Sequence, residues 1–266
     1  MNPEIIFKLF FLMMGAITGS FLNVCIVRLP KEESIVTPRS HCVNCKNPIA
    51  WFDNIPFISY MILSGKCRYC KEAISFRYFL VELMTASAFL GSYFLYGLDW
   101  VLVPYLVMIS CFIVATFVDF EHRIIPDEIS VGGLVAGLVF SFFIPQLHQG
   151  DNHFLSLGRS LFGALVGGGA IYAMGMLGDL IFKKESMGGG DVKLMAMVGA
   201  FMGWKLALLA FFIAPFFGAI YGLVEKLRTK DSTIAYGPFL VLGSLVSLIW
   251  GDPIIAWIMS GYGLYR

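Results

Sequence analysis

Two aspartates stand where carboxylates are costly, at the edges of apolar stretches. Asp119 closes one apolar run, in Ala-Thr-Phe-Val-Asp, and Asp191 opens a later one, in Gly-Gly-Gly-Asp-Val-Lys. An acidic group at the centre of a membrane span costs roughly 2.5–3.5 kcal/mol, so acids in or beside such runs are candidate functional groups. Two carboxylates that share a proton cannot both ionise easily, so one acts as an acid and the other as a base. Such a pair can activate water to hydrolyse an amide, and Asp119 and Asp191 are therefore predicted as a catalytic pair.

The residues beside these acids suggest how a substrate would be held. Gly188, Gly189 and Gly190 lack Cβ atoms, so this backbone can adopt positive φ and lie against an extended peptide. A flexible turn is the alternative interpretation of these glycines. Lys193 is placed to pair with Asp191, to steer lipid phosphates or to flank the membrane. Asp127 follows Pro126 and is expected to cap the next helix.

Four cysteines form a repeated pattern in the one large polar insertion. Residues 42–49 and 67–74 both read C-x-x-C-K-x-x-I, and two such turns supply the four thiolates of a tetrahedral zinc site. With all four positions filled, the zinc would be structural, and it would stabilise a loop that has few core residues. Disulfides or a redox pair are the alternatives, which a reducing compartment disfavours. The predicted metal ligands are Cys42, Cys45, Cys67 and Cys70.

The composition is that of a membrane protein, so membrane-spanning helices must position these groups. The 266 residues are 58% hydrophobic and 14% charged, which excludes disorder, and the net charge of +1 gives no indication of a nucleic-acid partner. A membrane-spanning helix needs about 20 apolar residues. We predict an all-α polytopic membrane protein with about eight transmembrane helices, over 5–27, 78–98, 101–118, 129–145, 157–182, 192–204, 206–224 and 234–259.

The basic residues predict the orientation of these spans. Fifteen Lys and Arg residues fall on one side of the predicted membrane and four on the other. Because basic loops stay in the cytoplasm, the first side is predicted to be cytoplasmic. The insertion and both aspartates then lie at the cytoplasmic face. The cytoplasmic loops are 28–77, 119–127, 183–193 and 225–231.

These residues resemble a known family. Gly188-Gly189-Gly190-Asp191 ahead of Lys193, with the earlier Asp119, is similar to the type IV prepilin peptidases, membrane aspartic proteases of the Gly-x-Gly-Asp class. The paired C-x-x-C motifs match the cytoplasmic insertion of that family. Three further segments resemble its other signatures, in the same order along the chain: Gly19 to Val24 with Arg28-Leu29-Pro30, Ile74 to Tyr78 with Val81-Glu82-Leu83, and Tyr236 to Phe239.

The resemblance implies cleavage, at the cytoplasmic face of the bacterial inner membrane, of the basic leaders of type IV prepilins or type II secretion pseudopilins. It also implies methylation of the new N-terminal amine with S-adenosylmethionine, to which Asn23, Arg77 and Glu82 are candidate contributors. The alternative role of those three is hydrogen bonding between helices. The implied domains are a first transmembrane helix (1–27), a zinc-binding insertion (28–77) and a seven-helix aspartic protease domain (78–266).

Two other functions fit parts of this pattern. An ion-coupled transporter also holds membrane acids, but near the middle of the bilayer and commonly with an internal repeat of spans, which this sequence lacks. A thiol-disulfide membrane carrier would use a C-x-x-C pair, usually within or beside spans, whereas both pairs here lie in a polar insertion. We therefore expect a peptidase, with its prepilin substrates and membrane lipid as partners.

Overall fold

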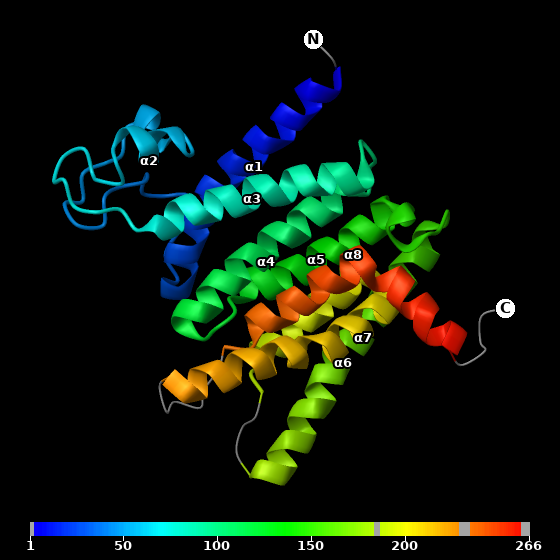
Figure 1. Cartoon of the computed structure of the whole chain (residues 1–266). Coiled ribbons are helices and arrows are strands. Elements are labelled where there is room, and N and C mark those ends of the chain that lie inside the picture. Colours follow the sequence, from blue (N-terminus) through cyan, green and yellow to red (C-terminus); the bar gives the residue numbers. More distant parts are fainter. Residues whose placement is uncertain (1–2, 184–186, 229–234, 262–266) are drawn as a thin grey trace. The chain divides into compact units, whose positions relative to one another are not determined.

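A computed structural model describes residues 3–183, 187–228 and 235–261, without the side chains of Phe182, Lys226 and Arg228. Every regular element in these ranges is a helix (Figure 1), which confirms the predicted all-α class. The chain divides into two compact units, Met1–Val114 and Ala115–Arg266. The boundary falls within helix α4 (Leu102–His122). The predicted cytoplasmic loops 183–193 and 225–231 lie partly outside the described residues.

The first unit is built on two long helices packed along each other, α1 (Pro3–Arg28) and α3 (Phe76–Tyr96). Their backbones meet at glycines, since a Cβ on Gly15 would lie 2.7 Å from Ala86 Cα and a Cβ on Gly19 would lie 2.7 Å from Glu82 Cα. In the sequence, the insertion connects these two helices. Its regular structure consists of η1 (Leu29–Lys31), η2 (Trp51–Asn54) and the short helix α2 (Ile58–Ile62).

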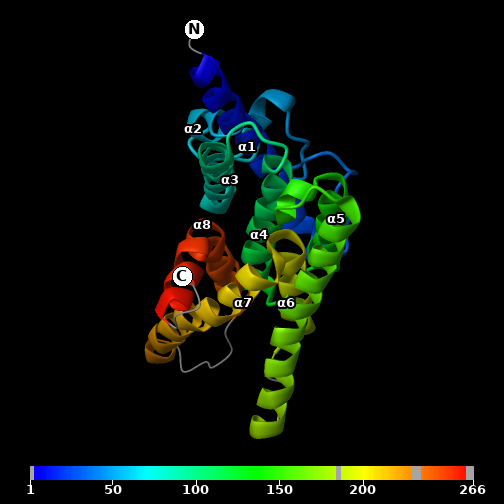
Figure 2. The ribbon, with the colours of Figure 1, turned by 90° about the vertical axis from the view of Figure 1, so that its right-hand side faces the viewer.

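In the second unit, the long helix α7 (Gly189–Arg228) packs against α5 (Asp127–Phe143), α6 (His153–Phe182) and α8 (Gly237–Gly261). Figure 2 shows these helices from the side. Small residues let α6 approach α7 closely, because Cβ atoms on Gly163 and Gly167 would collide with the backbone carbonyls of Gly199 and Met195. A short η3 (Pro145–His148) joins α5 to α6.

Helix α7 contains a break at Gly203, whose φ of 77° and ψ of 169° only glycine readily adopts. A break at this position removes the helical partner of the Ala200 carbonyl. Two side chains replace that partner: His148 Nε2 donates at 3.0 Å and Ser160 Oγ at 2.7 Å. Burial lowers the pKa of His148, which favours the neutral ring. The two predicted spans 192–204 and 206–224 are thus the two arms of one broken helix.

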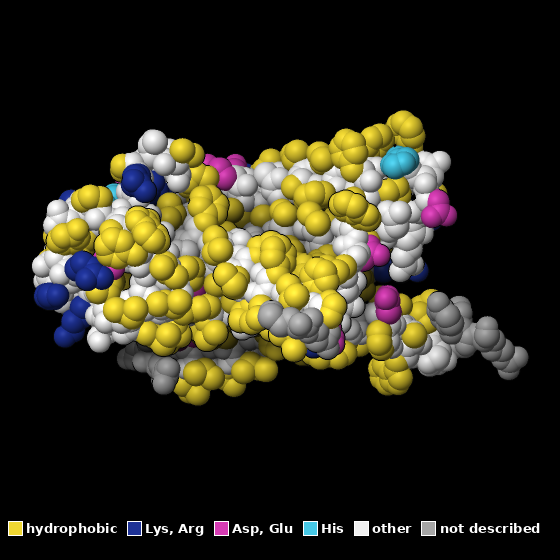
Figure 3. Space-filling view, turned by 90° about the horizontal axis from the view of Figure 1, so that it is seen from above, with side chains coloured by type: hydrophobic (Ala, Val, Ile, Leu, Met, Phe, Trp, Pro, Cys, Tyr) yellow, Lys and Arg dark blue, Asp and Glu magenta, His cyan; other side chains and the backbone are white. Residues whose placement is uncertain are grey.

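The helices have the length and exposed surface of membrane spans. Six of them, in the part of the chain that the structure describes, are long and apolar enough to cross a bilayer, and α5 adds 17 further residues. Large hydrophobic side chains lie open on their surfaces, such as Met13, which is 62% exposed, and Phe216, which is 71% exposed. Figure 3 shows hydrophobic side chains over much of the visible face. The protein is therefore a multi-pass membrane protein, and eight crossings stay a prediction.

Candidate active site and metal centre

Asp119 lies in the last turns of α4 and is 5% exposed. Its Oδ2 accepts a hydrogen bond of 2.9 Å from the backbone N–H of Gly237, the first residue of α8. The contact leaves no room for a side chain, because a Cβ on Gly237 would lie 2.8 Å from the same oxygen. The start of α8 therefore fixes the position of the Asp119 carboxyl group. The sequence indicated Tyr236-Gly237 only as a family signature, without a local reason for it.

Asp191 lies in the first turn of α7, and its carboxyl group receives a hydrogen bond from the backbone N–H of Gly188. The charge of Asp119 acts on Asp191, and the charge of Asp191 acts in turn on the phenol of Tyr236. The structure thus places the two predicted carboxyl groups within electrostatic range of each other, from helices far apart in the sequence. Their catalytic role stays a prediction.

Limited space explains one of the glycines before Asp191, Gly190, whereas a Cβ on Gly189 would have no atom within 4 Å. The described glycines with positive φ are Gly65, Gly97 and Gly203, so residues 188–190 do not adopt the left-handed backbone that they could take. A Cβ on Gly190 would instead lie 3.1 Å from the Cβ of Ile125, and a Cβ on Gly237 would lie 3.1 Å from Ile125 Cδ1. The buried Ile125 therefore packs between the starts of α7 and α8.

Lys193 pairs with Asp127, and not with Asp191 as one interpretation of the sequence expected. Its Nζ lies 2.7 and 2.9 Å from the two carboxylate oxygens of Asp127. Asp127 does not occupy the expected cap position: Pro126 precedes the helix and Asp127 is its first residue. The pair links the first turns of α5 and α7 beside the two acids. Sequence spacing could not show it, because the two residues are 66 positions apart.

The four cysteines lie in two turns with the same backbone hydrogen bonds. In the first turn, Cys42 N–H donates to Asn47 O at 2.9 Å and Lys46 N–H to Cys42 O at 3.0 Å. In the second, Cys67 N–H donates to Glu72 O at 2.8 Å and Lys71 N–H to Cys67 O at 3.0 Å. The sequence repeat is therefore also a structural repeat, as expected for two zinc knuckles.

The sulfur atoms meet across the two turns. Cys42 Sγ lies 3.8 Å from Cys70 Sγ, and Cys45 Sγ lies 4.0 Å from Cys67 Sγ. Four thiolates at about 2.3 Å from a tetrahedral ion stand about 3.8 Å apart, so the four cysteines could hold a metal ion. These separations are far longer than a disulfide of about 2.05 Å. Backbone N–H groups of Cys70 and Tyr69 lower the pKa of Cys67 to about 7, which favours the thiolate form that a metal binds, whereas burial and the neighbouring thiols raise the pKa of Cys70 to about 11.

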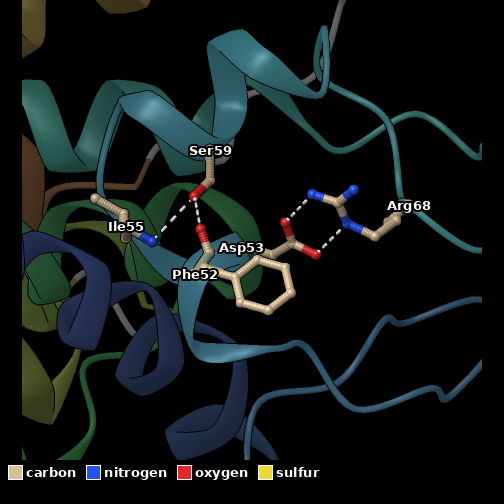
Figure 4. A network of polar contacts seen from close by, with 5 residues as sticks. All are labelled: Phe52, Asp53, Ile55, Ser59 and Arg68. Atoms are coloured by element: carbon tan, nitrogen blue, oxygen red, sulfur yellow. Dashed lines mark hydrogen bonds and ion pairs between the residues drawn. The ribbon is translucent and has the colours of Figure 1, made fainter.

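A polar network ties the linker between the turns to the second turn (Figure 4). Arg68 holds the Asp53 carboxylate through two hydrogen bonds, of 2.7 Å from Nε and 2.6 Å from Nη2. This guanidinium lowers the pKa of Asp53. The buried Ser59 hydroxyl donates to Phe52 O at 2.9 Å and accepts from Ile55 N–H at 3.0 Å. These contacts fix the segment between the two cysteine turns.

The three candidates for methyl transfer lie in the first unit, where α1, α3 and the insertion adjoin. The buried Asn23 donates to Tyr78 O at 3.0 Å, while its Oδ1 has no partner. Glu82 Oε2 accepts from Phe57 N–H at 2.9 Å, at a backbone position with φ of 61°. Arg77 is the second residue of α3, and its guanidinium carbon lies over the Tyr78 ring, 5.3 Å from the ring centre. Asn23 and Glu82 thus have structural contacts, and a role in methyl transfer stays a prediction.

Fold and site together define a multi-pass membrane protein with a carboxyl pair in one unit and a cysteine cluster in the other. Two family descriptions match this sequence: the bacterial peptidase A24 N-terminal domain over residues 13–96 and the type IV leader peptidase family over residues 106–223. The chain belongs to the type IV leader peptidase family. The resemblance seen in the sequence is therefore confirmed.

Relatives named prepilin leader peptidase/N-methyltransferase match most of the chain. The protein from Pseudomonas aeruginosa is 34% identical, over 93% of this chain and 92% of its own length. The protein from Aeromonas salmonicida is 30% identical, over 97% and 95%. The protein from Myxococcus xanthus is 38% identical over 84% of this chain, which spans 64% of that relative. No solved structure matches the chain.

Proposed function

We propose that this protein is a prepilin leader peptidase that also methylates the new N-terminal residue of its product. The observation that carries the proposal is the full-length match to peptidases of this name together with two carboxyl groups within electrostatic range. An ion-coupled transporter explains the acids but not the family match. The substrates would be type IV prepilins or type II secretion pseudopilins.

Asp119 and Asp191 would catalyse hydrolysis as a pair. One carboxylate accepts a proton from water as the water oxygen attacks the scissile carbonyl, and the other carboxyl group protonates the departing amine. The N–H groups of Gly237 and Gly188 orient the two carboxyl groups for these steps. The glycines 188–190 would leave the substrate backbone room beside Asp191.

The substrate would reach this site by inserting into the membrane. A prepilin carries a basic leader ahead of an apolar helix of about 20 residues, which places the scissile bond at the membrane boundary. The excess of basic residues in the predicted cytoplasmic loops supports a site that faces the cytoplasm of the bacterial inner membrane.

The cysteine cluster would hold a structural zinc ion through Cys42, Cys45, Cys67 and Cys70. Four thiolate ligands complete a tetrahedral site and leave no position for a reactive water. The ion would fix the insertion beside Asn23, Arg77 and Glu82. Methylation would transfer the methyl group of S-adenosylmethionine to the free amine of the cleaved product, which then loses a proton.

Mass spectrometry of a prepilin incubated with the purified protein tests both activities. We expect loss of the leader without S-adenosylmethionine, and loss of the leader plus one methyl group with it. Asp119→Asn and Asp191→Asn should each lower the rate of cleavage by a factor of about 10²–10⁴, the contribution that is typical of general acid-base groups. Asp252→Asn, an exposed acid of α8, is the matched control. Cleavage that persists with both aspartates replaced would refute the proposal.

A further inference from the structure

A pocket in the first unit is lined by none of the residues assigned to the activities proposed above. It has a volume of about 390 Å³ and lies along α1, between that helix and the segments 35–40 and 54–56 of the insertion. One part of its wall is apolar, with Ile17, Phe21 and Val24 of α1. Another part is lined by Arg28 and Arg39.

The arginines give this pocket an uncompensated positive charge. Arg28 is 7% exposed, and its guanidinium donates only to backbone carbonyls, those of Ser34 and Pro38, each at 2.8 Å. Among the described residues, no carboxylate lies within ion-pair distance of Arg28 or Arg39, and none lines the pocket. Glu82 does not line the pocket; its carboxyl group accepts hydrogen bonds from the Phe57 N–H and from Ser20, which does line it. Arg28 is thus a buried charge with hydrogen bonds but no counter-ion, which is costly, and the exposed Arg39 adds a second positive charge. The pocket therefore favours an anionic ligand.

The apolar wall sets the shape of that ligand. Ile17 and Phe21 are 61% and 48% exposed on a helix long enough to cross the membrane. The distance from Ile17 to Arg28 along the helix axis is about 16 Å. This is about half the thickness of a hydrocarbon layer of ~30 Å. The pocket therefore extends from the polar end of α1 to the middle of the bilayer, which is the depth of one leaflet.

We propose that this pocket binds an anionic phospholipid, with its phosphate at Arg28 and Arg39 and an acyl chain along Ile17, Phe21 and Val24. Basic pockets at the ends of membrane helices commonly hold acidic headgroups. Two other ligands fit the charge poorly. The basic leader of a prepilin would be repelled by the two guanidinium groups. S-adenosylmethionine has one carboxylate but also an ammonium and a sulfonium, so its net charge is positive and it lacks the long acyl chain that the apolar wall accommodates.

Native mass spectrometry of the full-length protein, titrated with phosphatidylglycerol or phosphatidylcholine, tests this proposal. We expect one phosphatidylglycerol to be retained in preference to phosphatidylcholine. Arg39→Gln should weaken that binding about fivefold, the effect of one basic group near an acidic headgroup. Lys31→Gln removes the same charge from the same end of α1, at an exposed residue that does not line the pocket, and should have no effect.

A second variant separates a shaped site from general attraction. Because Arg28 is buried and its replacement endangers folding, Val24→Trp is used to fill the pocket without changing its charge. It should reduce the retained phosphatidylglycerol, while added inorganic phosphate should not displace the lipid from the unaltered protein. Unchanged binding in Arg39→Gln and Val24→Trp would overturn the proposal. So would displacement of the lipid by phosphate, S-adenosylmethionine or a leader peptide.

Discussion

The two aspartates and the four cysteines are held in place by different means. Asp119, in the last turn of α4, and Asp191, in the first turn of α7, both belong to the second unit, and a backbone N–H orients each carboxyl group. The four cysteines lie in short turns of an insertion whose described residues form little regular structure. Helix packing can place groups that repel each other without an added ion. The turns need a cation to offset the charge of four thiolates.

Metal removal should therefore have the largest effect, and only on the insertion. Binding of a structural zinc contributes on the order of 10 kcal/mol in small zinc domains. We expect a chelator, or the double change Cys42→Ser and Cys45→Ser, to make residues 28–77 sensitive to protease while the long helices stay intact. Limited proteolysis with metal analysis measures this. Equal resistance with and without chelator would contradict a metal-stabilised insertion.

Arg68→Gln provides a matched control within the insertion, because it removes one ion pair, in which Arg68 is 45% exposed and Asp53 7% exposed, and keeps all four cysteines. It should cause a much smaller loss of protease resistance. Arg68 lowers the pKa of Asp53, so the contribution of the pair is full above the unfolded pKa of about 3.9. It is lost as the pH falls through the lower folded pKa. The difference between the two proteins should therefore disappear in acid.

Crowding the acid pair should have the next largest effect, on activity alone. A Cβ at Gly237 would lie 2.8 Å from Asp119 Oδ2, so Gly237→Ala must displace the carboxyl group. A displacement of about 1 Å can cost a factor of about 10² in rate. We expect a loss of that size in prepilin cleavage, with unchanged metal content. Gly158→Ala, where no atom lies within 4 Å, is the control. Full activity of Gly237→Ala would show that this contact does not position Asp119.

The smallest effect is expected for the ion pair between α5 and α7. Lys193 and Asp127 are 44% and 64% exposed, and exposed pairs contribute about 0.2–1 kcal/mol. Lys193→Gln should lower the rate of cleavage at most about fivefold. The exchange Asp127→Lys with Lys193→Asp should restore part of it, as measured by kcat and KM on a prepilin. A loss as large as that of Asp191→Asn would instead place Lys193 in the chemistry.

Sequence patterns predicted the long helices well, because a membrane span is a local property of composition and length. The predicted span 78–98 is α3, and the span 129–145 is α5, each displaced by two residues. The predicted spans 192–204 and 206–224 meet at residue 205, and the break in α7 lies at Gly203. Hydropathy located the interruption, but the contacts of His148 and Ser160 that stabilise it join distant segments.

The sequence by itself determined the family, the membrane class and the repeat of the cysteine turns, because each depends on residue types at fixed local spacing. Only the tertiary structure decided what surrounds the acids. The N–H of Gly237 at Asp119, Ile125 against Gly190 and Lys193 beside Asp127 join residues that are 65 to 118 positions apart. Such contacts follow from how the helices pack, and no pattern of local spacing encodes them.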